Sequence, residues 1–198
     1  MSVSLAEEIA SVAARLVVDE GMEYAQAKRK AARTLGRHPR GAAELPTNER
    51  VEDEVRSYID LFCADTQPAE LRALRELALR WMQRLAGFRP HLSGAVWRGT
   101  ATRLSSIHID LYCDDPKAAE IELINLGVDY DLASGDSGAT VHYLSVAEHC
   151  AALNEWVTLH LAVRDLDDQR GALKPDARGR SWRGDTAAVQ RLLQADTP

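Results

Sequence analysis

The sequence predicts an α+β fold, in which helices come first and a mixed sheet with flanking helices follows. Apolar residues recur at helical spacing through roughly the first ninety residues. Between Ser106 and Cys113 the period changes to two, as polar and apolar residues alternate. Helices first and strands later favour α+β packing over a doubly wound sheet. We expect a helical N-terminal region over residues 1–89 and an α/β core with a C-terminal helix over 90–198.

Four helices are expected in the N-terminal region. The first begins at a capping box, in which Ser4 is followed three residues later by Glu7. The second runs from about Glu23 to Leu35, before a glycine. The third carries apolar residues on one face between Val51 and Phe62. The fourth begins near Pro68, because proline suits the first turn of a helix.

The core is expected to hold a strand over Ile107–Cys113 and a helix opened by proline over Pro116–Leu126. Later strands and a C-terminal helix follow from apolar runs separated by turn residues. These are strands over Val128–Leu132, Thr140–Val146 and Trp156–Val163 and a helix over Asp185–Leu193.

Composition is that of an ordinary globular protein, with 45% hydrophobic and 27% charged residues. The start of the chain lacks the basic and apolar regions of a signal peptide, and no stretch is long enough to span a bilayer. Cys63, Cys113 and Cys150 are widely spaced and include no C-x-x-C pair, which argues against a disulfide framework. We therefore expect a cytosolic protein with no membrane partner.

Basic residues gather in one segment of a protein whose net charge is -6. Between Lys28 and Arg40 there is no acidic residue. Such a strip can steer a polyanion such as RNA to one face, and a solvated helix face is the alternative. The candidate polyanion-binding residues are Lys28, Arg29, Lys30 and Arg33.

The segment Leu92–Asp115 reads LSGAVWRGTATRLSSIHIDLYCDD and resembles the signature of the polymerase-beta-like nucleotidyltransferase superfamily. In that family a strand ends in Gly-Ser, a short helix and a loop often reading Arg-Gly-Thr-Ala follow, and a second strand begins Ser-Asp-hydrophobic-Asp. Here Gly94-Ala95 falls on the Gly-Ser pair and Ser105–His108 on the opening of the second strand. Beyond this segment the resemblance is topological, to about Val163.

The resemblance implies a nucleotidyltransferase-like core that binds an NTP. Small residues at the turn let backbone N–H groups approach phosphates, and an arginine matches phosphate oxygens bidentately. The nucleotide-binding residues it implies are Gly94, Ala95, Arg98, Gly99 and Thr100.

Family members use magnesium ions held by strand carboxylates two residues apart, which point to one face. This chain places Ser106 and His108 at those positions, with Asp110 next on the same face. The candidate catalytic residues are therefore Ser106, His108 and Asp110, and the candidate metal ligands are His108, Asp110 and His160. Because Mg²⁺ prefers oxygen ligands, the replaced carboxylates predict weak or lost metal binding. Mn²⁺ or Zn²⁺ on His108, His142 and His160 is the alternative.

Two functions stay open. The first is an enzyme that transfers a nucleotidyl group from an NTP, weakened or inactive through its replaced carboxylates. The second is a non-catalytic module that binds a nucleotide, RNA or a protein. The segment DEGMEYAQAKRKAA, Asp19–Ala32, also resembles a group of proteobacterial nucleotidyltransferase-like proteins of unsettled function, and this adds no activity.

Overall fold

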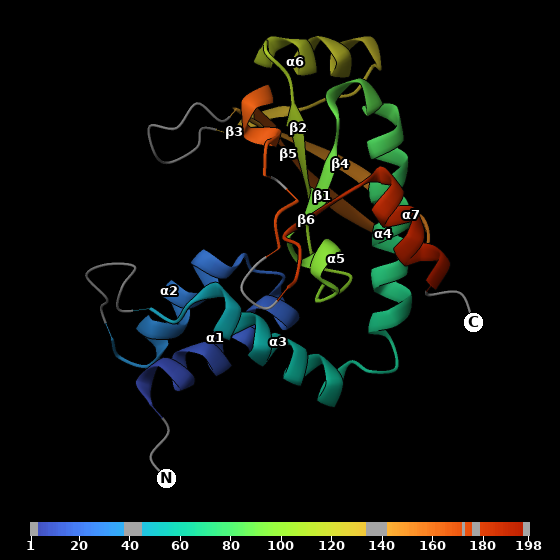
Figure 1. Ribbon diagram of the computed structural model, residues 1–198. Helices are drawn as coiled ribbons and strands as arrows, with labels where there is room; N and C mark the ends of the chain where they lie inside the picture. Colours follow the sequence, from blue (N-terminus) through green and yellow to red (C-terminus); the bar gives the residue numbers. More distant parts are fainter. Residues whose placement is uncertain (1–3, 38–44, 134–141, 172, 176–178, 196–198) are drawn as a thin grey trace. The chain divides into compact units, whose positions relative to one another are not determined.

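The computed structural model describes residues 4–37, 45–133, 142–171, 173–175 and 179–195. Within these residues, seven α-helices and a six-stranded mixed sheet confirm the expected α+β fold (Figure 1). The chain divides into a helical unit, residues 1–69 with 100–105, and a sheet unit, residues 70–99 with 106–198. The division thus falls within the first turn of the fourth helix, between Ala69 and Glu70, whereas the sequence placed it at residue 89. None of the described helices combines the length and hydropathy needed to cross a membrane.

The helical unit contains three helices, α1 (Leu5–Glu20), α2 (Tyr24–Thr34) and α3 (Asn48–Phe62). The predicted capping box is present, because the Ser4 hydroxyl accepts from the Glu7 N–H at 3.3 Å and the Glu7 carboxylate accepts from the Ser4 N–H at 2.7 Å. These hydrogen bonds satisfy donors that a helix start otherwise leaves without partners.

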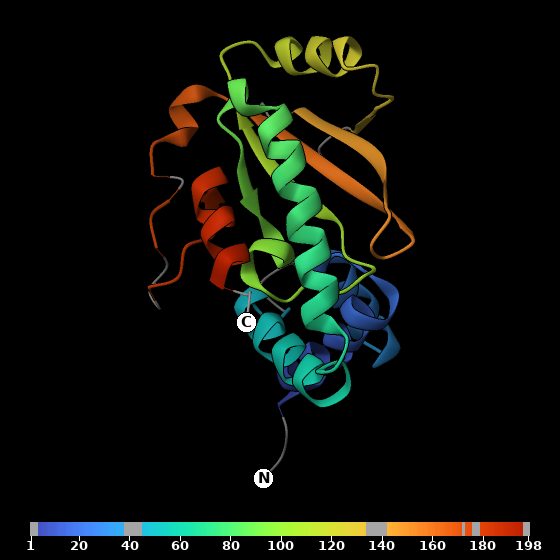
Figure 2. The same cartoon turned by 90° about the vertical axis from the view of Figure 1, so that its right-hand side faces the viewer.

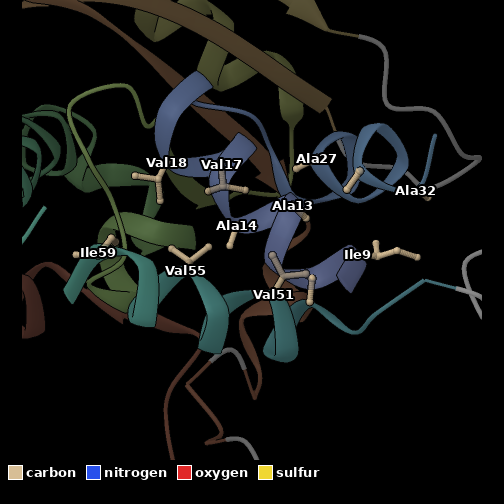
Figure 3. Packing of buried hydrophobic residues seen from close by; sticks show 12 residues of the cluster. Ile9, Ala13, Ala14, Val17, Val18, Ala27, Ala32, Val51, Val55 and Ile59 are labelled. Carbon is tan, nitrogen blue, oxygen red and sulfur yellow. The ribbon is translucent and has the colours of Figure 1, made fainter. Parts of the chain in front are cut away.

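The core of the helical unit consists mainly of alanine, valine and isoleucine (Figure 3). Alanine at the helix contacts lets the helix axes approach closely, and the β-branched residues fill the remaining space. The buried residues are Ile9, Ala10, Ala13, Ala14, Val17, Val18, Ala27, Ala31, Ala32, Val51, Val55 and Ile59.

Residues 100–105 pack within the helical unit although they are distant from it in sequence. A Cβ built on Gly21, the left-handed C-cap of α1, would lie 2.6 Å from the Leu104 carbonyl oxygen. The buried Gln67 amide donates to the Ala101 carbonyl at 2.9 Å. Gly21 therefore serves both a positive φ and a close backbone approach, which a larger residue would obstruct.

The sheet unit contains the remaining elements. Its helices are α4 (Gln67–Arg84, whose first three residues belong to the helical unit), α5 (Gly94–Arg98), α6 (Pro116–Asn125) and α7 (Thr186–Ala195), with 3-10 turns η2 (Ala86–Phe88) and η3 (Leu166–Gln169). Its strands are β1 (His91–Ser93), β2 (Ile107–Tyr112), β3 (Asp131–Ala133), β4 (His142–Cys150), β5 (Glu155–Arg164) and β6 (Arg183–Asp185).

The strand order is β3-β4-β5-β2-β1-β6, and β2 pairs parallel to β5 while the other pairs are antiparallel. One face of the sheet is apolar, with buried residues such as Ile109 and Leu161 in register. Helices α4 and α7 lie along one face of the sheet in both views (Figures 1 and 2). The apolar residues of α4, among them Leu74, Leu77 and Trp81, are fully buried there. This packing supplies the main hydrophobic stabilisation of the unit.

Strand boundaries differ from the predictions in two places. Strand β3 begins at Asp131, not at Val128, because the Val128 N–H donates to the Leu123 carbonyl at 3.0 Å and completes the C-terminal cap of α6. Strand β6 was not anticipated, since it lies in a charged segment without alternation. Of the strand predicted over Thr140–Val146, the first two residues lie outside the described part of the chain.

Candidate functional site

The other face of the sheet is polar, because every second residue of its central strands points there. The pairing register places His108 beside Ser93 and His160, and Asp110 beside His91. This set is called the polar face below. It includes two predicted metal ligands from β2 and one from β5, brought together by the parallel pairing of those strands.

The turn between β1 and α5 contacts the polar face through Gly94. Its φ is 68°, in the left-handed region that favours glycine. A Cβ at Gly94 would lie 3.1 Å from Cδ2 of His108. Glycine thus allows the turn to pass directly over the His108 ring, and strand, short helix, loop and second strand follow in the expected order.

His108 and His160 lie side by side, with ring centroids 5.0 Å apart. Ser145 Oγ on β4 lies 3.1 Å from Nδ1 of His160 and orients that ring. His142 is three residues from Ser145, the β4 residue opposite His160, and its register opposite Val163 puts it on the other face of the sheet. It therefore cannot join His108 and His160 as a ligand.

Asp110 is nearly inaccessible, at 3% exposure, and both of its carboxylate oxygens are bound by arginines. Arg164 Nε of β5 donates to Oδ1 at 2.7 Å, and Arg183 Nε of β6 donates to Oδ2. The three groups together carry a net charge of about +1, so the field they create favours an anion. Charge-assisted hydrogen bonds of this kind also tie β6 to the centre of the sheet.

Tyr112 follows Asp110 on the polar face and is 1% exposed. Its hydroxyl has no hydrogen-bond partner among the described residues. Burial, and then the negative charge of Asp110, raise the pKa of Tyr112 above its ordinary value near 10. The ring packs edge-on against His91, with centroids 5.2 Å apart.

The predicted nucleotide-binding arginine, Arg98, ends α5 and stacks on Trp182, with its guanidinium carbon 4.3 Å from the ring centroid. Trp97 is used structurally: its Nε1 donates to the Ser181 carbonyl at 2.9 Å, and its ring lies against Gly184. Arg75 of α4 donates through Nε to the Val96 carbonyl at 3.2 Å and so supports the end of α5. Helix α5, which carries Arg98, is therefore held by contacts from α4 and from the segment around Ser181.

The remaining predicted residues are distributed as follows. Ala95 lies in α5, and Gly99 is the left-handed C-cap of that helix. Ser106 is half-buried and lies one residue before β2. Thr100 belongs to the helical unit, where its buried hydroxyl has no partner among the described residues. Gly94, Ala95, Arg98 and Gly99 therefore lie in the sheet unit and Thr100 in the helical unit.

The donor set does not fit magnesium. Mg²⁺ requires near-octahedral oxygen ligands, and the predicted ligands are two imidazoles, those of His108 and His160, and one carboxylate that is already bound by two guanidinium groups. Among the described residues of the sheet unit, no three His, Cys, Asp or Glu side chains converge closely enough to hold an ion. His108 and His160 match zinc or manganese better, since these metals accept imidazole.

Two of the candidate polyanion-binding residues already make contacts inside the helical unit. Lys28 donates to the Pro46 carbonyl at 3.1 Å and to Asn48 Oδ1 at 2.8 Å, and burial lowers its pKa. Lys30 pairs with Glu20 at 2.6 Å. Arg29 and Arg33 are exposed on α2, whereas Arg40 lies outside the described residues.

Sequence reasoning did not identify Arg164, Arg183 and Ser145 as members of the polar face. Each reaches it through strand pairing over a long sequence separation, for which the sequence carries no local pattern.

Comparison with known proteins finds no matching family model, no similar curated protein and no similar solved structure.

Proposed function

We propose that this chain is a non-catalytic, nucleotidyltransferase-like module that binds a nucleotide without a divalent metal. The observation that carries the proposal is the pair of arginines on Asp110. Nucleotidyl transfer needs carboxylates that hold two metal ions, and the carboxylate present here is neutralised by Arg164 and Arg183. Guanidinium groups can themselves neutralise phosphate charge, so a triphosphate can be bound where a metal pair is not.

Two further features support nucleotide binding. Gly94 gives a turn without a side chain beside His108, which is where the resemblance places the phosphates. Arg98 is held by its stack on Trp182, which is 38% exposed, so that a guanidinium and an aromatic face lie together. An oriented guanidinium loses less entropy on binding a phosphate than a mobile one does.

The histidine pair favours a second candidate, a weak enzyme that uses manganese or zinc. His108 and His160 are adjacent, and the Ser145 contact on Nδ1 orients the His160 ring beside His108. An RNA- or protein-binding version of the module has less support, because Lys28 and Lys30 are engaged inside the helical unit. A cytosolic location is part of the same proposal.

Calorimetric titration of the full chain with each of the four NTPs, in magnesium, manganese, zinc and EDTA, tests the proposal. We expect one or more nucleotides to bind with equal affinity in EDTA and in magnesium. Replacement of Arg98 by glutamine should weaken binding about tenfold, the loss of roughly one charged hydrogen bond. Arg191→Gln, an exposed arginine on α7, is the matched control and should leave the affinity unchanged.

Two results would overturn the proposal of metal-independent nucleotide binding. Absence of binding under all conditions would remove the nucleotide as ligand. Binding that requires manganese or zinc, with release of pyrophosphate and loss of both in His108→Gln, would establish the enzyme instead.

A further inference from the structure

A concave site lies at the end of the polar face where β1 begins. An open pocket of about 760 Å³ is bounded by residues just before and within β1 and by residues from 166–171 and 173–175, which follow β5. Its volume is within the range of small-molecule pockets. His91 belongs to both the pocket and the polar face, but none of Gly94, Arg98, Arg164 and Arg183, on which the nucleotide proposal rests, lines the pocket.

The charge of this pocket is opposite to that of the whole protein. Arg89, Arg170 and Lys174 line it, against one acidic residue, Asp167. The lining therefore carries a net charge of about +2 on a chain whose net charge is -6. Cations gathered around a concavity repel one another, and an anion between them relieves that repulsion.

Arg89 is held in place by both its backbone and its side chain. Its φ of 48° is in the left-handed region, which costs a non-glycine residue free energy. Its Nη1 donates to Gln169 Oε1 at 3.2 Å, and its carbonyl accepts from His91 Nδ1 at 2.8 Å. These contacts join the two sides of the pocket through one residue.

His91 is 4% exposed and yet lines the pocket. A carbonyl can only accept, so the contact with Arg89 requires the proton on Nδ1. Nε2 is then the polar ring atom that remains for another partner, and it donates to a phosphate or carboxylate oxygen only when it also carries a proton. The edge-on contact with Tyr112 fixes the plane of the imidazole.

Lys174 is positioned by a tight turn. Its N–H donates to the Gly171 carbonyl at 3.0 Å, and its Cδ lies 3.4 Å from where a Gly171 Cβ would be. The side-chain stem thus lies over Gly171. Leu166 and Leu173 provide an apolar wall, and Leu173 is half exposed although it is a large hydrophobic residue.

We propose that this pocket binds a small organic anion, with a phosphate or carboxylate against Arg89, Arg170 and Lys174 and an apolar body against Leu166 and Leu173. Such a ligand matches both the charge and the apolar wall, whereas a bare inorganic ion uses only the first. The site goes beyond the proposed nucleotide function and does not depend on it.

The test is calorimetry on the full chain with phenyl phosphate, benzoate, inorganic phosphate, benzyl alcohol and benzamidine as probes. We expect phenyl phosphate or benzoate to bind, inorganic phosphate to bind more weakly, and the neutral and cationic probes not to bind. Which of the two aromatic anions binds better identifies the head group. Binding should weaken as salt is added, because the cations are accessible to ions.

The variant R170A/K174A removes two exposed cations that line the pocket and should lower the affinity at least about tenfold. The matched control K117A/R191A removes two exposed cations outside the pocket and should have no effect. Equal binding of benzyl alcohol, no binding of either aromatic anion at millimolar concentration, or full affinity in R170A/K174A would overturn the proposal. Nucleotide binding should survive R170A/K174A, and aromatic-anion binding should survive Arg98→Gln, so the two sites fail independently.

Discussion

Gly184 of β6 lies directly against the indole ring of Trp97. A Cβ at this position would overlap Cζ3 and Cη2 of the ring and come within 2.7 Å of Cε3. The same tryptophan donates its Nε1–H to Ser181, so the edge strand and α5 are held by one side chain. Arg183, one of the two arginines that donate to Asp110, precedes this glycine in β6. The position of β6 therefore affects the polar face.

Substitution of Gly184 by alanine should therefore destabilise the chain. We expect a loss of about 1–3 kcal/mol, since a rigid ring rather than a flexible side chain must move. Urea unfolding followed by tryptophan fluorescence measures the change. Gly87→Ala is the control, because a Cβ there meets no atom within 4 Å, and it should be close to neutral. Equal stability of the two variants would contradict the packing of Trp97 on β6.

Gly94→Ala tests the approach of the β1–α5 turn to His108. The alanine must keep the positive φ of Gly94. Its Cβ would lie 3.1 Å from Cδ2 of His108, so the ring has to shift. Gly127→Ala, with a φ of 66° and no atom within 4 Å, carries the backbone cost alone, about 1 kcal/mol. We expect Gly94→Ala to cost more than this control and to change the imidazole NMR signals of His108. An unchanged spectrum with equal stability would show that the turn does not touch the ring.

Asp110→Asn tests the role of the double arginine contact. Loss of the charge leaves Arg164 and Arg183 close together without a counter-ion. We expect a loss of about 2–3 kcal/mol, less than for a fully buried pair because both guanidinium groups keep contact with solvent. Thermal denaturation measures it, and Asp131→Asn, an exposed aspartate on β3, is the control. Nearly equal stabilities would indicate that the arginines have other partners.

Tyr112→Phe should leave stability unchanged or raise it by up to about 1 kcal/mol, because the buried hydroxyl lacks a partner among the described residues. Tyr58→Phe is the contrast, since that hydroxyl donates to Asp19 Oδ2 at 3.0 Å, and it should cost about 1 kcal/mol. A destabilised Tyr112→Phe variant would reveal a hydrogen bond of the hydroxyl.

Tyr112 also predicts a dependence on alkaline pH. Burial raises its folded-state pKa above the unfolded value near 10, so the unfolded chain loses this proton first as pH rises. Its contribution to stability is thus complete below about pH 10 and is lost as pH increases through the folded pKa. Denaturation at several alkaline pH values should show a decline that is smaller in Tyr112→Phe. An identical decline in both proteins would assign it to other groups.

Local features were predictable from the sequence because neighbouring residues create them. The Ser4 capping box needs only Ser4 and Glu7, and the turn at Gly94 follows from the short motif around it. The amphipathic pattern of α4 predicts a helix with a buried face but not which core it joins, and α4 groups with the sheet.

The arginines on Asp110 were beyond such reasoning. Arg164 and Arg183 are 54 and 73 residues away in the chain, and only the sheet order brings them to Asp110. Likewise, His108 meets His160 because β2 and β5 pair in parallel with those residues in register, which no single-strand pattern reveals.

Residues 100–105 have a consequence for how this protein can be dissected. The polypeptide passes between the two units three times, after residues 69, 99 and 105, so the helical unit is not one continuous piece of chain. An expression fragment that stops at Ala69 loses the Ala101 carbonyl that Gln67 binds and the backbone that Gly21 approaches. Truncation would expose part of the interior of that fragment, so assays on excised halves would report damage as well as function. Point substitutions in the intact chain are the sound way to assign activities to either unit.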